Sequence, residues 1–379
     1  EEEYKDSYHK VFMDYKEPLF WIHLNMDYPF NLKGILYFPK INMEYDNLEG
    51  VIKLYNNQVF IADNIKEVIP EFLMLLKGVI DCPDLPLNVS RSALQNDGFV
   101  KKISDYITKK VADKLSGMCK TDHENYEKYW DDISPFIKFG CLKDEKFAEK
   151  MNDYIIFKNL EGKYVTLKEY LDGNMAKREK TVFYVTDEKE QSQYINLFKE
   201  EGIDALILKH SIDSPFIGRL EQKNEGVKFL RIDSDLADSF KDETEEDEEK
   251  AKENADSLTE IFRKALQNDK LEVKVERLKK ESISAMITES EESRRMQEMM
   301  KMYNMYGMDP SMFGPSLTLV LNANNKLVQY VLNHKDGEHT NEICEQLYDL
   351  ALLSHGSLSP ERMTKFIART NEMMMFMAE

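Results

Sequence analysis

Hydrophobic and polar positions change their period several times along this chain. An apolar stripe at helical spacing predicts a helix over 4–16. Short runs rich in β-branched and aromatic residues follow and predict strands. An apolar stretch over 70–80 predicts a further helix. The residues of the first stripe are Tyr4, Tyr8, Val11, Phe12 and Tyr15, and the strand-like runs are Leu19–Asn25, Gly34–Phe38, Val51–Tyr55 and Val59–Ala62.

The longest periodic pattern extends from Ser92 to Met118 and predicts one long amphipathic helix. Two more helices are predicted at about 122–139 and 144–158. Strand-like and helical stretches then alternate between 181 and 232, which is typical of a small α/β unit. Its predicted strands are 181–185, 205–208 and 227–232, and its predicted helices are 188–201 and 212–220.

The last third of the chain is mixed in character. The segment 238–250 holds eight acids against two lysines, which indicates a domain boundary or a solvated helix start. Seven of the 20 methionines of the chain fall within 289–313. The other elements predicted here are a helix at 251–268, two strand-like runs in 271–288, a strand at 317–321 and helices at about 324–333, 338–354 and 359–377.

Length and charge narrow the possible roles. The 379 residues are enough for two or three domains, and the net charge of −19 argues against general nucleic-acid binding, which needs clustered Lys and Arg. The four cysteines lie far apart without a CxxC or Cys/His cluster, so we expect no metal and a reducing compartment. We expect no membrane span and no signal peptide, and a chain that begins at Glu1 suggests a fragment or a processed product.

The run Asp84–Asn96 holds the strongest candidates for chemistry. Asn88 and Ser90 are good helix N-cap residues, and Arg91 and Gln95 then share one helix face. An arginine at a helix N-terminus can bind a phosphate through its planar fork. From the local pattern alone, a helix cap followed by a solvent-facing arginine is the more common situation.

A nucleotide site is otherwise missing from the sequence. There is no GxxxxGK[ST] or GxGxxG motif, so if Arg91 acts on ATP, another domain must hold the nucleotide. There is also no GxSxG elbow, and the seven histidines lack motif spacing.

Two apolar surfaces are candidates for binding partners. Met296, Met300 and Tyr303 follow one another at i, i+4 and i+7 beside Met299, and core packing and an exposed partner-binding helix are equally good interpretations. The last two predicted helices carry apolar faces that suit pairing within the chain or between two copies. Those faces include Ile343, Leu347, Leu350, Leu353, Met363, Phe366, Ile367 and Met374.

A set of short runs along the chain carries a family resemblance. The runs are Tyr15–Leu19, Gly34–Pro39, Val59–Asp63, Ile69–Leu73, Lys77–Asp81 and Asp84–Gln95. They resemble the middle and C-terminal parts of the ninety-kilodalton heat-shock chaperones of the bacterial HtpG type. The match is densest up to about residue 120 and remains ordered to the end, where Leu350–Leu353 precedes the last helix.

The resemblance implies a multidomain α+β and α/β fold. A middle domain with an α/β sandwich is expected over 1–235, with a large α/β part to about 118, a helical connector at 119–160 and a small α/β part at 161–235. An acidic linker or helix start is expected at 236–256. An α+β dimerisation domain then occupies 257–379.

The family also implies a split ATPase site. An ATPase domain of the GHKL type normally lies upstream and binds ATP with Mg²⁺, so no cofactor is expected in this chain, and alone it is not expected to hydrolyse ATP. Arg91 would reach the γ-phosphate when the domains close. Gln95 and Asn88 match the neighbouring glutamine and the loop asparagine of the family.

Partners follow from the same resemblance. Unfolded client proteins would contact Tyr15 and the stretch around Met296, Met299, Met300 and Tyr303. A homodimer would form through about 338–377. The expected interface residues are Leu347, Leu350, Leu353, Phe366 and Ile367.

The sequence departs from the family pattern at several places. Ser92 follows the arginine where many members carry an acid, and Gln58 replaces a common basic residue. The end lacks MEEVD and KDEL peptides, so we expect no TPR co-chaperones and a bacterial cytoplasmic location.

Two functions of other classes remain as alternatives. One is a holdase or scaffold that binds partners without ATP. The other is a free-standing enzyme with a nucleotide at the strand ends of 180–232, and the lack of a glycine-rich first turn there disfavours it.

Overall fold

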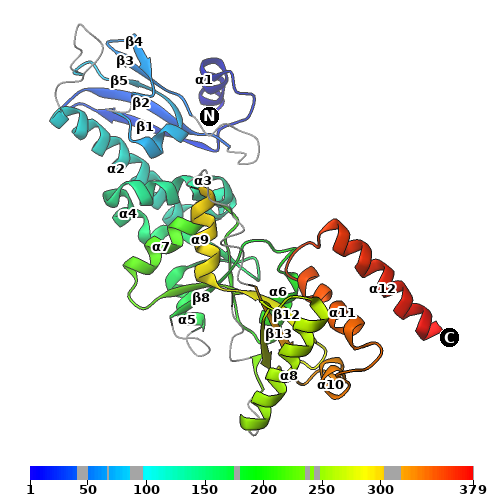
Figure 1. Ribbon diagram of the computed structural model, residues 1–379. Helices are drawn as coiled ribbons and strands as arrows, with labels where there is room; N and C mark the ends of the chain where they lie inside the picture. Colours follow the sequence, from blue (N-terminus) through cyan, green and yellow to red (C-terminus); the bar gives the residue numbers. More distant parts are fainter. Residues whose placement is uncertain are drawn as a thin grey trace. The chain divides into compact units, whose positions relative to one another are not determined.

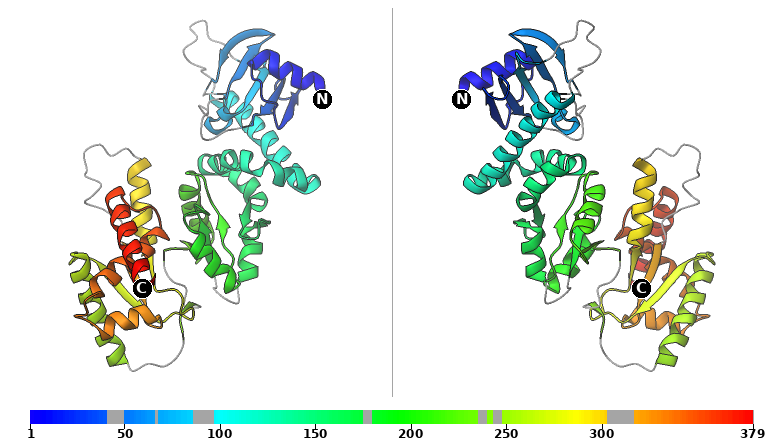
Figure 2. Two further views of the ribbon diagram at one scale, coloured as in Figure 1. Left: turned by 90° about the vertical axis from the view of Figure 1, so that its right-hand side faces the viewer. Right: turned by 90° about the vertical axis from the view of Figure 1, so that its left-hand side faces the viewer.

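The computed structural model describes residues 1–40, 50–65, 68–85, 97–174, 180–234, 240–242, 248–302 and 317–378, with backbone only at 97, 248, 297–302 and 377. The chain forms two compact units (Figures 1 and 2). The first comprises 1–156 and 210–220, and the second comprises 157–209 and 221–379. Sheets and helices occur in both, which confirms the mixed α/β class, whereas the domain boundaries expected from the family stay a prediction.

The first unit is built on a five-stranded sheet in the order β1-β2-β5-β3-β4. Neighbouring strands are antiparallel except for β3 and β5. Helix α1 lies beside this sheet (Figure 1). The elements are α1 (Glu2–Phe12), β1 (Phe20–Met26), β2 (Leu32–Phe38), β3 (Ile52–Asn56), β4 (Val59–Asp63), the 3₁₀ helix η1 (Glu71–Leu75) and β5 (Lys77–Asp81).

Helices complete the first unit. They are α2 (Asp97–Thr121), α3 (His123–Lys143), α4 (Glu145–Met151), the 3₁₀ helix η2 (Asn152–Tyr154) and the first part of α7 (Asp213–Lys223). Aromatic rings join them to the sheet. Phe38 of β2 makes an edge contact with Phe136 of α3 at 5.1 Å, and Phe72 of η1 lies 4.8 Å from Phe147 of α4.

Gly140 of α3 allows this close helix packing. A Cβ at this position would lie 2.7 Å from the Phe147 ring and 2.8 Å from the Phe72 ring, well inside van der Waals contact. A side chain there would therefore force α3 away from α4 and η1.

The edge strand β1 is protected near its C-terminal end by a side chain. The Tyr106 hydroxyl of α2 donates to the carbonyl of Asn25 at 2.8 Å and accepts from the Asn25 N–H at 3.2 Å. Both backbone groups of this strand residue are therefore satisfied without another strand.

Three predicted helices need correction. The first, predicted over 4–16, ends at Phe12, because Met13 adopts a left-handed conformation with φ of 50°. The apolar stretch 70–80 forms η1 and then β5, since Lys77–Asp81 pairs with strands on both sides. The pattern over 144–158 forms α4 and η2 and leads into a strand, because tertiary pairing outweighs local propensity.

The second unit begins with a five-stranded sheet in the order β10-β8-β9-β6-β7. Strand β8 pairs in parallel with both β10 and β9, as the alternating pattern predicts for an α/β unit. Helices flank its strands on both sides (Figure 2). Its elements are β6 (Ile156–Asn159), β7 (Tyr164–Thr166), α5 (Leu167–Asn174), β8 (Thr181–Val185), α6 (Ser192–Glu200), β9 (Leu206–Ile207) and β10 (Lys228–Arg231).

A three-stranded sheet in the order β11-β13-β12 forms the rest of the second unit. Strands β11 and β13 are parallel, and β12 and β13 are antiparallel. The elements are α8 (Glu248–Leu266), β11 (Glu272–Glu276), β12 (Ala285–Glu289), α9 (Glu291–Met302), β13 (Leu317–Asn322), α10 (Lys326–Asn333), α11 (Thr340–Leu353) and α12 (Pro360–Ala378).

Strands β12 and β13 are buried on both faces. Ile287 and Leu319 belong to a hydrophobic core with Phe262 of α8 and Leu347 of α11. The alternate residue Met286 belongs to a second core with residues of β8 and α6. The period of two along a strand therefore places one sheet between two cores.

A buried ion pair holds α7 against α3. Lys138 Nζ binds Asp213 Oδ1, with both side chains about 5% exposed or less, and the other carboxylate oxygen of Asp213 accepts the His210 N–H at 2.9 Å. Removing one partner of a buried pair leaves a charge without compensation.

We expect Lys138→Met to lower the free energy of unfolding by about 3 kcal/mol, because Asp213 stays buried. Urea titration of the chain measures this loss. The matched control is Lys150→Met at the exposed pair with Asp113, which should cost less than about 1 kcal/mol. Equal, small losses at the two positions would contradict a structural role for the Lys138 pair.

Candidate functional site

Asn88, Arg91 and Gln95 lie outside the described residues, but the chain entering their segment is well defined. Asn56 Nδ2, at the end of β3, donates to the carbonyls of Cys82, Pro83 and Leu85 at 3.1–3.3 Å. The next turn of the sheet supports this loop, since the Gln58 N–H donates to the carboxylate of Asp81 at 3.0 Å. The side chain of one asparagine thus fixes three carbonyls within four residues of this loop.

A second anchor holds the same loop from the other side. Asp84 Oδ2 accepts the backbone N–H of Asn31 at 2.6 Å and its side-chain amide at 3.1 Å. Where the chain is described again, Phe99 of α2 makes an edge contact with Phe30 at 5.5 Å. Both ends of 86–96 are therefore attached to one sheet and its loops.

Tyr15 is held outward by an anchored loop. Its side chain is 99% exposed, and Met13 before it is 84% exposed. Between them, the carboxylate of Asp14 accepts from the Tyr8 hydroxyl at 2.7 Å and from Lys77 Nζ at 2.6 Å. Burial alone would raise the pKa of Asp14, but these two bonds reverse the effect and lower it to about 2.

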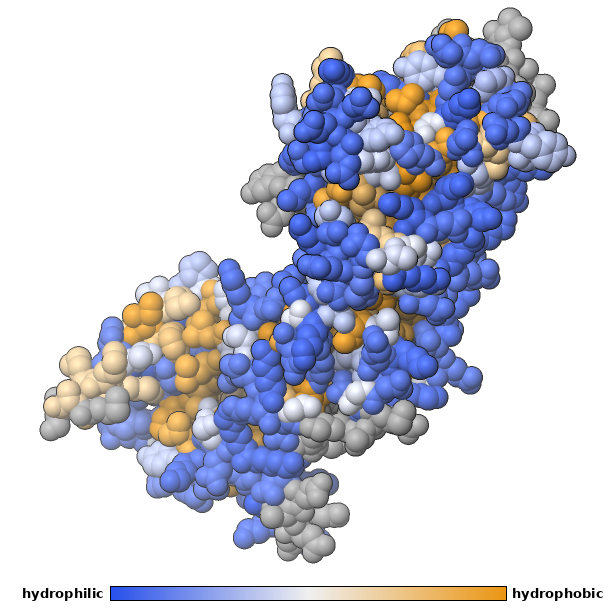
Figure 3. Space-filling view, turned by 180° about the vertical axis from the view of Figure 1, so that it is seen from behind, coloured by the Kyte–Doolittle hydropathy of each residue, from blue (hydrophilic) through white to orange (hydrophobic). Residues whose placement is uncertain are grey.

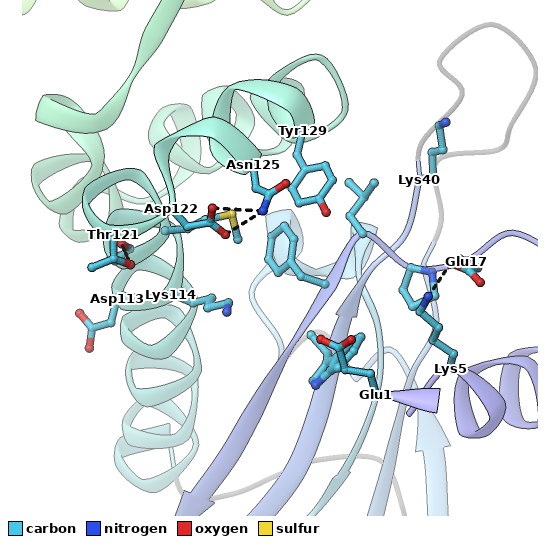
Figure 4. A pocket seen from close by; sticks show the side chains of 16 residues that line it. Glu1, Lys5, Glu17, Lys40, Asp113, Lys114, Thr121, Asp122, Asn125 and Tyr129 are labelled. Carbon is cyan, nitrogen blue, oxygen red and sulfur yellow. Dashed lines mark hydrogen bonds and ion pairs between the residues drawn. The ribbon is translucent and has the colours of Figure 1, made fainter. Parts of the chain in front are cut away.

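A pocket of about 840 Å³ opens in the first unit, and its lining includes Glu17 and Pro18, which follow Tyr15 closely in the sequence (Figure 4). Asn125 donates to Asp122 at 3.0 Å on the helical side, and Lys5 pairs with Glu17 at 2.7 Å near α1. Charges of both signs surround an aromatic floor, an arrangement that suits a mixed polar and apolar chain segment. The lining residues include Phe20, Trp21, Lys114 and Tyr129.

The methionine helix is α9. Met296 is 42% exposed, whereas Met299 and Met300 lie on α9 with side chains outside the description, and Tyr303 lies outside it altogether. The first turn of α9 binds residues of β8, β10 and α7. Sequence reasoning did not find these partners, because they lie far from α9 in the chain.

The C-terminal helices present an apolar surface. Leu350 is 46% and Ile367 is 52% exposed, Leu353 and Phe366 are half-buried, and Leu347 is buried in the core of its own chain, beneath this face. Figure 3 shows apolar side chains gathered over this part of the molecule. The most exposed members near the end of α12 are Met374, Met375 and Phe376.

A buried aspartate ties α12 to α11. Asp349 is 2% exposed and accepts hydrogen bonds from Arg362 and Arg369 of α12. Arg369 also pairs with Glu345 at 2.5 Å. The orientation of the exposed face of α12 is thus set by ion pairs on its inner side.

Metal-binding, reactive-thiol and membrane-spanning features are the other kinds of site that concern the described residues. No three His, Cys, Asp or Glu side chains of the described residues come together as metal ligands would. The four cysteines are free thiols, and burial raises the pKa of Cys82 to about 11. Among the described helices, none combines the length and the apolar character that crossing a bilayer requires.

Comparison with known proteins decides the family. The family model described as Hsp90 protein matches residues 1–379. This chain belongs to the Hsp90 family. The HtpG-type resemblance is therefore confirmed.

Curated bacterial relatives agree with this assignment. The Hsp90-family chain is 40% identical over 351 residues to a chaperone protein HtpG of Bacteroides fragilis strain YCH46, covering 89% of this chain and 51% of the relative. It is 39% identical over 345 residues to the chaperone protein HtpG of Porphyromonas gingivalis strain ATCC 33277, covering 88% and 50%. It is 30% identical over 382 residues to the chaperone protein HtpG of Borreliella afzelii strain PKo, covering 98% of this chain and 60% of that relative. The chain spans about half the length of the first two.

In this Hsp90-family chain a buried charge cluster lies where β10 ends. Arg231 Nε donates to Asp233, and Arg231 Nη2 binds Glu289 of β12 at 3.0 Å. His355 Nδ1 lies 3.3 Å from the other oxygen of Asp233. Burial alone would raise the pKa of Asp233, but His355 and Arg231 outweigh it and lower that pKa to about 2.

This shift predicts a loss of stability in acid. An unfolded aspartate titrates near 3.9, so the lowered pKa of Asp233 stabilises the folded state fully above about pH 5, and the contribution disappears as pH falls towards 2. Asp233→Asn should cost about 2 kcal/mol at pH 7 and flatten the pH dependence of the unfolding free energy between pH 5 and 2. Denaturant titrations at several pH values measure the pH dependence of the unfolding free energy. The control is Asp269→Asn, which removes the same charge at an exposed position. An unchanged acid slope in Asp233→Asn would refute the assignment.

Proposed function

We propose that this chain is the middle and C-terminal part of an ATP-driven, dimeric Hsp90-type chaperone that assists the folding of client proteins. One observation carries the proposal: the Arg91 segment belongs to a family match over the whole chain, and both of its ends are fixed on one sheet. The bacterial relatives and four free thiols support a bacterial cytoplasmic setting.

Arg91 is the proposed catalytic residue. Its guanidinium would bind the γ-phosphate of ATP held with Mg²⁺ on an upstream domain, and would neutralise charge as the phosphoryl group is transferred to water. Gln95, four residues later in the sequence, would orient this group, and Asn88 would hold the loop. The anchoring of the loop by Asn56 and Asn31 supports this, since an arginine acting across domains needs a fixed base.

In the full-length protein, Arg91→Ala should lower the ATP turnover number by about a hundredfold while changing ATP affinity by less than about threefold, because the contact forms in the transition state. Steady-state hydrolysis and equilibrium nucleotide binding measure the two effects. Lys101→Ala removes an exposed cation of α2 and is the matched control. Unchanged turnover in Arg91→Ala would exclude the catalytic role.

Client proteins are proposed to bind at two places. Tyr15 and the adjoining pocket offer an aromatic contact on the first unit, and Met296, Met299, Met300 and Tyr303 of the second offer a flexible, polarizable surface. Exposed apolar residues on anchored elements support this role, because they can bind unfolded chains without sequence preference.

Dimerisation is proposed through the exposed faces of α11 and α12. Leu350, Leu353, Phe366 and Ile367 would meet their counterparts across a two-fold axis, supported from beneath by Leu347. TPR co-chaperones are not among the proposed partners.

Ile367→Glu should raise the dimer dissociation constant by at least about a hundredfold, since a charge would be buried at an apolar contact. Analytical ultracentrifugation over a concentration series measures it. Lys365→Glu introduces the same charge at an exposed position of α12 and should change the constant by much less. A dimer unaffected by Ile367→Glu would place the interface elsewhere.

A holdase that works without ATP is the second candidate. The exposure of Tyr15, Met13 and Met296 favours it, because these contacts need no nucleotide. ATP-dependent release of a bound client by the full-length protein would separate the two functions in favour of the clamp.

A further inference from the structure

The base of α9 is attached to its neighbours through one carboxylate. Glu291, the first residue of the helix, accepts from the Tyr184 hydroxyl of β8 at 2.7 Å and from the Arg231 N–H of β10 at 3.0 Å. Its side chain is 13% exposed. A carboxylate at a helix N-terminus is favoured by the helix dipole, and here it also binds two strands of the neighbouring sheet.

Arg295 makes a second attachment one turn further on. Its guanidinium donates to both carboxylate oxygens of Glu221 at 2.7 and 3.1 Å and to the carbonyl of Phe229 at 3.0 Å. Its Nε donates to Glu291 at 2.7 Å. Burial acts to lower the pKa of Arg295, but Glu221 and Glu291 more than offset it and raise that pKa further above its ordinary value. The fork of one arginine thus joins α9 to α7, β10 and its own first turn.

Arg294 fills the space between these groups. It is 5% exposed, lies over the ring of Tyr184 and donates to Glu291 at 2.5 Å. Cations in the first turns of a helix oppose its dipole, so the two arginines are tolerated here because acids compensate them. These ion pairs can all form only when the base of α9 packs against β8, β10 and α7 in this one orientation.

We infer that Arg295, Glu221 and Glu291 are positioning residues for client capture: they hold the base of α9 so that Met296 and the methionines after it are presented on an ordered helix. The inference rests on the proposed client-binding role of α9. A helix that frays at its base must be ordered when a client binds, and the apparent affinity then falls in proportion to the ordered fraction.

The test compares client affinity with the order of α9. We expect Arg295→Met and Glu221→Gln each to raise the dissociation constant of fluorescein-labelled, reduced and carboxymethylated α-lactalbumin by about five- to tenfold. The double variant should be no more than about twofold weaker than either single one, because both break one interaction. Amide hydrogen exchange over 291–302 should accelerate by a similar factor in each variant.

Two variants serve as controls. Lys280→Met breaks a 2.7 Å pair with Glu200 of α6, in the same unit but away from α9, and should leave affinity within about twofold. Arg295→Lys keeps the charge but cannot hold Glu221, Glu291 and Phe229 together, so it should be intermediate. It also tests the inference if Arg295→Met folds poorly, which the thermal midpoint shows.

Met296→Glu separates this inference from the proposed function. It should weaken client binding without faster exchange at the base of α9. If Met296→Glu has no effect on binding, the proposed client role of α9 fails, and the inference fails with it. If Met296→Glu weakens binding but Arg295→Met changes neither affinity nor exchange, the positioning role alone is wrong. Weaker binding in Arg295→Met without faster exchange would also overturn it, since Arg295 would then contact the client itself.

Discussion

The second unit depends on a sheet in which two strands, β12 and β13, are buried on both faces. In β12, Ile287 faces the core formed with α8 and α11, and Met286 faces the core formed with β8 and α6. Every residue of Ala285–Glu289 is buried, and the polar residues of the strand, Thr288 and Glu289, lie at its end. The C-terminal helices and the small α/β sheet are thus packed on opposite faces of one wall.

Charged residues cluster at the C-terminal end of β12. Glu289 at the end of β12 pairs with Arg231, and Glu291 two residues later binds β8 and β10. Buried charges of this kind add little net stability, because their desolvation offsets their attraction. These charges instead raise the free energy of any packing arrangement in which one of them loses its partner. Burial of the apolar residues of β12 and β13 therefore supplies the free energy that packs the elements of the second unit together. The charged cluster determines the orientation in which they pack.

The pattern of residues along the chain predicted those elements whose conformation depends on neighbouring residues. Runs rich in β-branched and aromatic residues located β1, β3 and β4, and the helical period located the described part of α2 and, with ends shifted by a few residues, α8. It failed for Lys77–Asp81, where pairing with two strands decides the structure. The helical period also placed Tyr15 on a helix face. In the structure Tyr15 lies in an exposed loop, next to Asp14, which is bound by Lys77.

The candidate sites divide in the same way. The family resemblance named Arg91, Asn88 and Gln95, which no contact in the described residues tests. The partners of α9 were invisible in the sequence, because Tyr184 precedes Glu291 by 107 residues and Arg231 precedes it by 60. Their meeting is a property of the folded sheet, and no motif spacing encodes it.

The hydroxyl of Tyr106 has a consequence for the open edge of the first sheet. Unfolded segments readily add to an open sheet edge through backbone hydrogen bonds, and such addition grows into aggregates. Near the end of β1 the Asn25 donor and acceptor are both occupied by one phenol. An extended segment approaching this end of the sheet edge would therefore find no free backbone group at Asn25 with which to pair.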